Sequence, residues 1–225
     1  MEKRKVKLNV PNMLTMLRII LIPVFVACMI YIENPVACGI VSAIIFAVTA
    51  FTDFLDGYIA RKYNQITDFG KFMDAVADKL MVFSALLALT AKFAIAGQKT
   101  LDVGFSLGNG VTVTTNVVAE VMFHVLLWSS IIVFLRELGV TSIRLVCAKT
   151  DVGVIPANFF GKAKTVCQIA AVIVILIEFA INEGQRDFTT YYIASYILIA
   201  LMLFMTVASG LNYLKIYGKH INPNK

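Results

Sequence analysis

Four of the five aspartates between Phe51 and Leu80 recur at helical spacing, in a part of the sequence that is otherwise largely apolar. They are Asp53, Asp56, Asp74 and Asp78. Carboxylates repel one another in an apolar setting unless cations lie between them. Two divalent cations would balance the four charges, and ligands made only of oxygen favour Mg²⁺ or Mn²⁺ over zinc. Because two such ions can hold a diphosphate and stabilise the attacking and leaving oxygens, the pattern predicts metal-assisted phosphoryl transfer.

The spacing of these aspartates places them on two matched helix faces. The first face carries residues three or four apart, namely Asp53, Asp56, Gly57 and Ala60. The second face carries residues four apart, namely Gly70, Asp74 and Asp78. A short turn joins the two helices, so antiparallel packing would bring both faces to one depth. We therefore expect the four carboxylates to share one polar pocket.

The helices that carry the aspartates belong to a chain with the composition of a membrane protein. Of its 225 residues, 59% are hydrophobic and 15% are charged, whereas soluble domains have about 45–50% and about 25%. Six segments approach the length of about 20 mostly apolar residues that a membrane span needs. They are residues 14–32, 36–59, 70–96, 117–135, 160–181 and 191–213. We expect one all-α membrane domain over residues 1–225, with six transmembrane helices.

The basic residues predict the orientation of these helices. With a cytoplasmic N-terminus, all of the 20 lysines and arginines except Lys92, Lys99 and Arg186 fall on or near the cytoplasmic side. Both termini and the aspartates are then expected toward the cytoplasm, and the net charge of +6 indicates topology and anionic lipid rather than nucleic acid. We interpret residues 1–11 as a basic juxtamembrane segment. A cleaved signal peptide is the alternative, but its loss would remove one of the six spans.

The aspartates could also have a structural role or a role in transport. Helix caps and ion pairs could account for one or two of them, but not for four on matched faces. Carboxylates within a membrane also bind transported ions, so a cation or proton transporter stays an alternative. Transport sites usually lie near the bilayer midplane, often with internal repeats or broken helices. The sequence shows no internal repeat, and the aspartates lie toward one membrane face, which favours an enzyme.

The pattern D-x2-D-G-x2-A-R-x8-G-x3-D-x3-D resembles the signature of the CDP-alcohol phosphotransferases. Its fixed positions are all present as Asp53, Asp56, Gly57, Ala60, Arg61, Gly70, Asp74 and Asp78. The resemblance implies a six-helix membrane enzyme, usually a homodimer, that moves a substituted phosphate from a CDP-linked donor to an alcohol and releases CMP. It also implies that the four aspartates bind two divalent ions and that Asp78 is the general base that deprotonates the acceptor hydroxyl.

Further residues would bind the donor if the resemblance holds. Gly57, Arg61 and Thr67 would hold the nucleotide and its phosphates, while Ala60 and Gly70 are small residues on the same faces. Arg61 offers a fork of hydrogen-bond donors that suits a diphosphate. Nearer the N-terminus, a polar row at three-residue intervals could face the donor's head group; it consists of Asn12, Thr15 and Arg18.

Residues 9–24 and 135–168 resemble the corresponding segments of bacterial phosphatidylglycerophosphate synthases, a subfamily of these enzymes. The second segment contains Arg136-Glu137, Arg144 and the run IPANxxGKxKTxxQ. This resemblance implies CDP-diacylglycerol as donor, sn-glycerol 3-phosphate as acceptor and a bacterial cytoplasmic membrane as location. An apolar groove from the site to the lipid is then expected. Sibling enzymes that use serine, an inositol phosphate or phosphatidylglycerol stay open.

The charge of the second segment supports an acceptor that carries phosphate. Its basic side chains are Arg136, Arg144, Lys149, Lys162 and Lys164, which are more cations than a neutral alcohol needs. Topology alone would explain part of this charge. We expect Arg136, Arg144 and Lys164 to bind the acceptor's phosphate. Glu178, within the fifth predicted helix, receives no role from the sequence.

Overall fold

The computed structural model describes residues 10–63, 68–99, 117–147, 159–182 and 192–217. These residues form six helices: α1 (Val10–Tyr31), α2 (Pro35–Lys62), α3 (Asp68–Lys99), α4 (Val117–Cys147), α5 (Phe159–Asn182) and α6 (Ile193–Tyr217). Each helix contains a stretch that is long and apolar enough to cross a membrane. The described ranges contain no strand. The all-α fold with six membrane-spanning helices is therefore confirmed, whereas the juxtamembrane segment predicted at residues 1–11 lies mostly outside the described residues.

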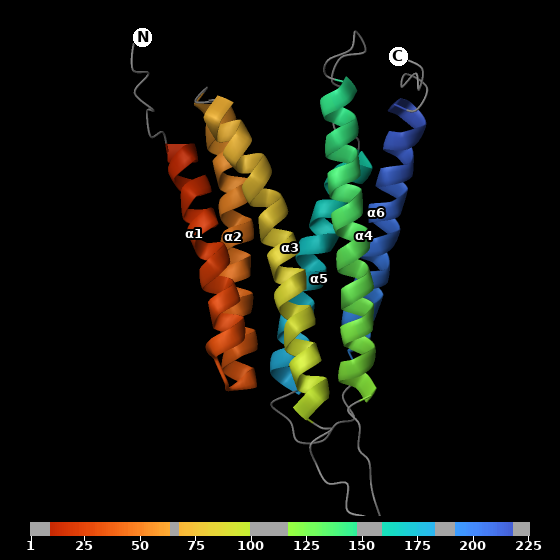
Figure 1. Cartoon of the computed structure of the whole chain (residues 1–225). Helices are drawn as coiled ribbons and strands as arrows, with labels where there is room; N and C mark the ends of the chain where they lie inside the picture. The colour runs from red at the N-terminus through yellow and green to blue at the C-terminus, as the bar shows by residue number, and fades with distance from the viewer. Residues whose placement is uncertain (1–9, 64–67, 100–116, 148–158, 183–191, 218–225) are drawn as a thin grey trace, which may run out of the picture.

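Successive helices run in opposite directions, so α1 begins and α6 ends at the same end of the bundle (Figure 1). That end also contains the end of α2, the start of α3, the end of α4 and the start of α5. α1 packs against both α2 and α3, which contact each other much less. α5 packs against α2 and α6, and α4 packs against α3 and α6. This arrangement gathers one terminus of every helix around the region where the sequence predicts the site.

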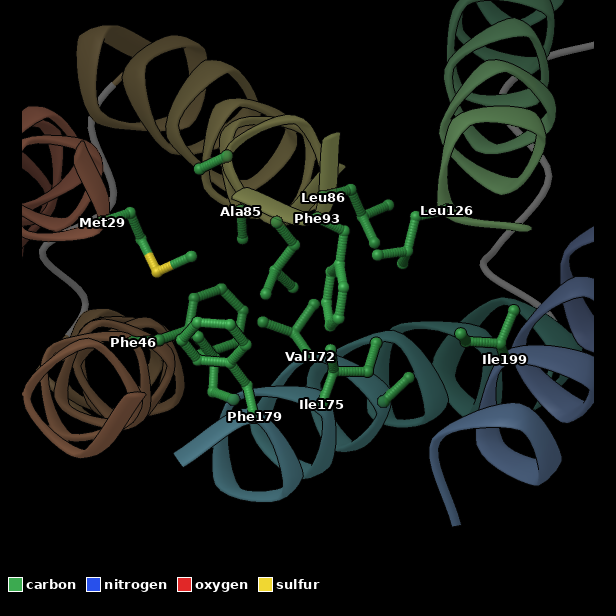
Figure 2. Packing of buried hydrophobic residues seen from close by; sticks show 14 of the residues in the cluster. Met29, Phe46, Ala85, Leu86, Phe93, Leu126, Val172, Ile175, Phe179 and Ile199 are labelled. Atoms are coloured by element: carbon green, nitrogen blue, oxygen red, sulfur yellow. The ribbon is translucent and has the colours of Figure 1, made fainter. Parts of the chain in front are cut away.

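A continuous apolar core holds the six helices together, and Figure 2 shows part of it. Phe93 of α3 lies at its centre, with ring centroids 5.7 Å from Phe179 of α5 and 5.3 Å from Tyr192. Phe25 of α1 and Phe46 of α2 form a second aromatic pair at 5.9 Å. Many large apolar side chains also point outward from the helices, as expected for surfaces that face lipid.

Two charged side chains far from the aspartates complete the backbone hydrogen bonding at helix ends. Lys92 donates from Nζ to the carbonyls of Met29, at 2.9 Å, and Ile32, at 3.3 Å, near the end of α1. Lys92 is one of the three basic residues that the predicted orientation places away from the cytoplasm, and this contact gives it a structural role. Glu178 accepts hydrogen bonds from the backbone N–H and the hydroxyl of Ser195, at the start of α6. Both side chains satisfy groups that a helix cannot pair within itself.

The fourth helix is longer than its apolar run predicts, because it continues past Leu135 to Cys147. Arg136 and Glu137 are therefore part of α4 rather than of a segment that follows it. The helix can continue because the side chains of its last turns contact α5 and α6, as Arg136 does with Ser209. Two of the three basic residues proposed for acceptor binding, Arg136 and Arg144, thus project from a helix that packs into the bundle.

Candidate active site

Three of the four aspartates converge between α2 and α3. Asp53 and Asp56 come from the second half of α2, and Asp74 comes from the second turn of α3. Each offers a carboxylate oxygen, and these three oxygens lie within 4.8 Å of one another. Asp56 is buried, with 4% of its surface exposed, while the Asp53 and Asp74 side chains are more open. We call these three residues the aspartate cluster.

Arg18 of α1 lies within the aspartate cluster and is completely buried. Its Nη1 is 2.6 Å from Asp53 Oδ1 and 3.1 Å from Asp74 Oδ1. Its Nη2 is 2.5 Å from Asp56 Oδ2. The sequence placed Arg18 in a polar row on α1 but did not predict these contacts, which join the first helix to the other two.

The other two residues of the polar row are also buried near the aspartate cluster. The Thr15 hydroxyl lies 3.3 Å from Asp56 Oδ2 and 3.1 Å from the carbonyl of Pro11, within reach of both acceptors. Asn12 lies about one turn earlier on the same helix. The polar row of α1 therefore faces the aspartates.

The small and basic residues predicted to bind the donor lie at the adjoining ends of α2 and α3. Gly57 follows Asp56 directly, and Gly70 lies in the first turn of α3. Ala60 and Arg61 are in the last turns of α2, but their side chains lie outside the described residues. Thr67 lies outside them entirely. These assignments stay predictions.

Asp78 lies one turn after Asp74 on α3, outside the group of three closely spaced oxygens. It lines an open pocket between α3, α4 and α5. It is four residues from Asp74 on α3, and it lines this pocket together with Glu137 and Lys164. Asp78 is therefore the residue at which the acidic and basic parts of the site meet.

The pocket beside Asp78 has a polar part and an apolar part. Glu137, Lys164 and Gln168 contribute to the polar part. Gln168 is only 2% exposed, and among the described residues its Nε2 has no hydrogen-bond partner. The apolar part is lined by residues that include Leu80, Val82, Phe83, Val133, Phe134 and Leu138. Leu80, Phe134 and Leu138 are also exposed on the outside of the bundle, so the pocket connects the polar residues with the surface expected to face lipid.

The basic residues predicted for acceptor binding are held by other side chains. Lys164, with 6% exposed, contacts the Glu137 carboxylate, and Arg136 Nη1 lies 2.9 Å from the same oxygen. Arg136 also donates a hydrogen bond to the Ser209 hydroxyl, and Arg144 donates one to the Tyr213 hydroxyl. Sequence reasoning missed Ser209 and Tyr213. Their signal in the sequence is weak: two residues with hydroxyl groups occur four apart, on one face of a largely apolar helix.

The aspartate cluster fits a hard divalent cation. Carboxylate oxygens are preferred ligands of Mg²⁺ and Mn²⁺, and no histidine or cysteine from the described part of the chain joins the group. The three carboxylates already hold the guanidinium group of Arg18 between them, so the cluster accommodates positive charge.

Comparison with known proteins gives consistent matches. The family model described as CDP-alcohol phosphatidyltransferase matches residues 8–208. A CDP-diacylglycerol–glycerol-3-phosphate 3-phosphatidyltransferase of Bacillus subtilis (strain 168) is 34% identical over 215 residues, which cover 91% of this chain and 93% of that protein. A protein of the same name from Rickettsia bellii is 30% identical and covers 96% and 99% of the two chains. A probable phosphatidylglycerophosphate synthase of Mycobacterium tuberculosis (strain H37Rv) is 30% identical over 206 residues, which cover 91% of this chain and 79% of that protein.

Proposed function

Because the chain belongs to the CDP-alcohol phosphatidyltransferase family, we propose that it transfers the phosphatidyl group of CDP-diacylglycerol to sn-glycerol 3-phosphate. The products are phosphatidylglycerophosphate and CMP. The chain is a multi-pass membrane enzyme of this family, and relatives named for this reaction match it over nearly their whole length. The observation that carries the proposal is the position of Asp78 between the aspartate cluster and the buried basic residues.

Metal binding is the first part of the proposed site. Enzymes of this family depend in general on metal ions, and the aspartate cluster offers three convergent carboxylate oxygens. We assign two divalent cations, Mg²⁺ or Mn²⁺, to Asp53, Asp56, Asp74 and Asp78. When bound, such ions polarise a diphosphate and make a nearby hydroxyl more acidic. The four carboxylates hold and orient them at one end of the bundle.

Asp78 acts as the general base in this proposal. It takes the proton from the acceptor hydroxyl, whose oxygen then forms a bond to the phosphorus of the phosphatidyl group. The bond between that phosphorus and the oxygen of the CMP moiety breaks, so CMP leaves with the electron pair. The location of Asp78 on the pocket wall, next to both charged groups, supports this role.

The acceptor's phosphate would bind to Arg136, Arg144 and Lys164. Glu137 is the carboxylate that contacts two of these three cations, so the group retains an excess of positive charge. A phosphate monoester carries about −1.5 to −2 charges near neutral pH, which matches that excess. Serine carries no phosphate that could bind to this excess positive charge. The excess charge therefore favours an acceptor that bears a phosphate.

The donor would lie along α1, α2 and α3. Asn12, Thr15, Gly57, Ala60, Arg61, Thr67 and Gly70 are the residues assigned to it. Burial of Asn12 and Thr15 beside the cluster supports a polar site for the head group. The apolar part of the pocket, open toward the outside at Leu80, Phe134 and Leu138, suits an acyl chain that stays in the bilayer.

The membrane setting follows from charge and from the relatives. The basic residues favour cytoplasmic termini and an active site that opens toward the cytoplasm. The bacterial relatives support a location in the bacterial inner membrane. We also assign a homodimer, on the basis of the family resemblance.

A panel of acceptors tests the proposed function. The purified full-length protein is given CDP-diacylglycerol, Mg²⁺ or Mn²⁺, and in turn glycerol 3-phosphate, serine, an inositol phosphate or phosphatidylglycerol, and CMP release is measured. CMP release that requires both metal and glycerol 3-phosphate supports the proposal. Release with another acceptor instead would assign a sibling reaction. No metal-dependent release with any acceptor, together with ion flux in liposomes, would indicate a transporter.

A further inference from the structure

The guanidinium group of Arg18 lies among the three carboxylates that would hold a metal ion. One guanidinium group contacts carboxylate oxygens from two helices, at 2.5 to 3.1 Å. The oxygens involved are Asp53 Oδ1, Asp56 Oδ2 and Asp74 Oδ1. The two terminal nitrogens make all of these contacts, and among the described residues Nε has no partner. The Arg18 side chain therefore contacts all three residues of the aspartate cluster.

The charges explain why the cluster holds together in this form. Three carboxylates within 4.8 Å of one another repel strongly when they are partly buried. Arg18 supplies one positive charge at hydrogen-bonding distance from each carboxylate, which offsets part of that repulsion. A buried arginine without these partners would itself be unfavourable. The arginine and the aspartates therefore stabilise one another.

A divalent cation at the same oxygens would lie next to the guanidinium group. Mg²⁺ binds carboxylate oxygens at about 2.0–2.1 Å, much closer than the nitrogen atoms lie. The cation and the guanidinium also repel each other, because both are positive. We therefore expect metal binding and the Arg18 contacts to oppose each other.

We propose that Arg18 is a built-in counter-ion of the aspartate cluster. It holds Asp53, Asp56 and Asp74 together when metal is absent, and it competes with the divalent cation for their oxygens. This proposal rests on the metal site of the proposed function. It makes Arg18 a positioning residue and couples α1, which carries it, to metal binding between α2 and α3. The metal affinity of the protein is then lower than that of the same cluster without Arg18.

Binding of Mn²⁺ alone tests the competition, without any substrate. The full-length protein in detergent is titrated with Mn²⁺, and the free ion is followed by electron paramagnetic resonance. Arg18→Gln should bind Mn²⁺ at least about tenfold more tightly than the unchanged protein, because a competing positive charge is removed. Arg18→Lys should lie between the two, since one ammonium group cannot span three carboxylates.

The matched control is Lys92→Met. Lys92 also connects α3 to α1 through a cation, but it does so at the carbonyls of Met29 and Ile32, at the other end of the helices. The Mn²⁺ affinity of Lys92→Met should equal that of the unchanged protein. Unchanged or weaker Mn²⁺ binding in both Arg18 variants would overturn the proposal. Absence of Mn²⁺ binding in the unchanged protein and in both Arg18 variants would instead contradict the metal site itself, and the counter-ion proposal with it.

Thermal unfolding gives a second readout. In EDTA, Arg18→Gln should melt at a lower temperature than the unchanged protein, because the three carboxylates lose their counter-ion. Mn²⁺ should raise its melting temperature by more than it raises that of the unchanged protein. An equal or smaller rise would overturn the proposal. If Arg18→Gln does not fold even with Mn²⁺, the Mn²⁺ affinity of Arg18→Lys decides: a tighter value supports the competition and an equal or weaker value overturns it.

Discussion

Arg144 of α4 donates a hydrogen bond to the Tyr213 hydroxyl of α6, and its guanidinium carbon lies 4.7 Å from the centre of the Tyr213 ring. Arg136 lies 5.9 Å from the same ring centre. Two arginines that we assign to the acceptor's phosphate are therefore positioned by one buried aromatic side chain from another helix. Flexible arginines lose conformational freedom when they bind, so fixing them in advance favours binding.

Tyr213→Phe should weaken acceptor binding. The substitution removes the hydroxyl that holds Arg144 and keeps the ring. We expect the KM for glycerol 3-phosphate to rise by about three- to tenfold with little change in kcat, because the lost hydrogen bond positions the arginine and does not itself contact the acceptor. Initial rates at varied glycerol 3-phosphate and saturating donor measure this. Tyr196→Phe, toward the other end of α6, is the control. Equal KM values for the two variants would contradict a role of Tyr213 in the site.

Lys164→Met should impair acceptor binding more than Lys162→Met. The two lysines lie two residues apart on α5, but Lys164 is buried against Glu137 and Lys162 is exposed. We expect the KM for glycerol 3-phosphate to rise at least about tenfold for Lys164→Met only, because a buried charged donor to phosphate is lost. Each substitution removes one positive charge, so a general effect of surface charge would change both variants alike. That result would rule out the assigned role of Lys164.

Asp78→Asn should abolish most turnover while the protein still binds its donor. Loss of a general base lowers kcat by about 10²–10⁴-fold. Since Asp78 lies outside the three closely spaced oxygens, we expect the variant to retain Mn²⁺ better than Asp53→Asn does. Single-turnover rates and Mn²⁺ titration distinguish the two variants. Normal turnover in Asp78→Asn would exclude Asp78 as the general base.

Much of the fold was predictable because its signals are local. Each span is a run of apolar residues, and a local contact also begins α2, where the Asn34 side chain accepts a hydrogen bond from the N–H of Ala37. The predicted end of the fourth helix, at residue 135, was wrong because this signal is also local. Hydropathy falls at Arg136, whereas the helix continues because its polar side chains find partners on α5 and α6.

The site was predictable only where its residues share a helix face. Helix geometry places Asp53 and Asp56 on one face of α2 and Asp74 on a face of α3, and the short segment between the two helices in the sequence predicts that these faces meet. Nothing in the sequence indicates that Arg18 reaches these carboxylates from α1, since helix packing sets that contact. The contact between Arg144 and Tyr213 joins residues far apart in the sequence for the same reason. Local spacing therefore predicts ligands within one helix, and tertiary packing decides their partners.

Gly39→Ala should destabilise the bundle without changing the active site. Gly39 of α2 lies against α5, and an added Cβ would be 2.6 Å from Ala180 Cβ and 2.7 Å from the Leu176 carbonyl oxygen. The helices would have to separate, which costs about 1–3 kcal/mol and lowers the melting temperature by several degrees.

Gly139→Ala is the matched control for this substitution, because an added Cβ on α4 there meets no atom within 4 Å. Alanine is favoured over glycine in a helix by roughly 0.5–1 kcal/mol, so its melting temperature should stay the same or rise. The contact of Gly39 lies near the start of α2, at the opposite end from Asp53 and Asp56. Below the unfolding transition, the KM values of Gly39→Ala should therefore equal those of the unchanged protein. Equal melting temperatures for the two glycine variants would show that α2 and α5 do not pack this closely in the membrane.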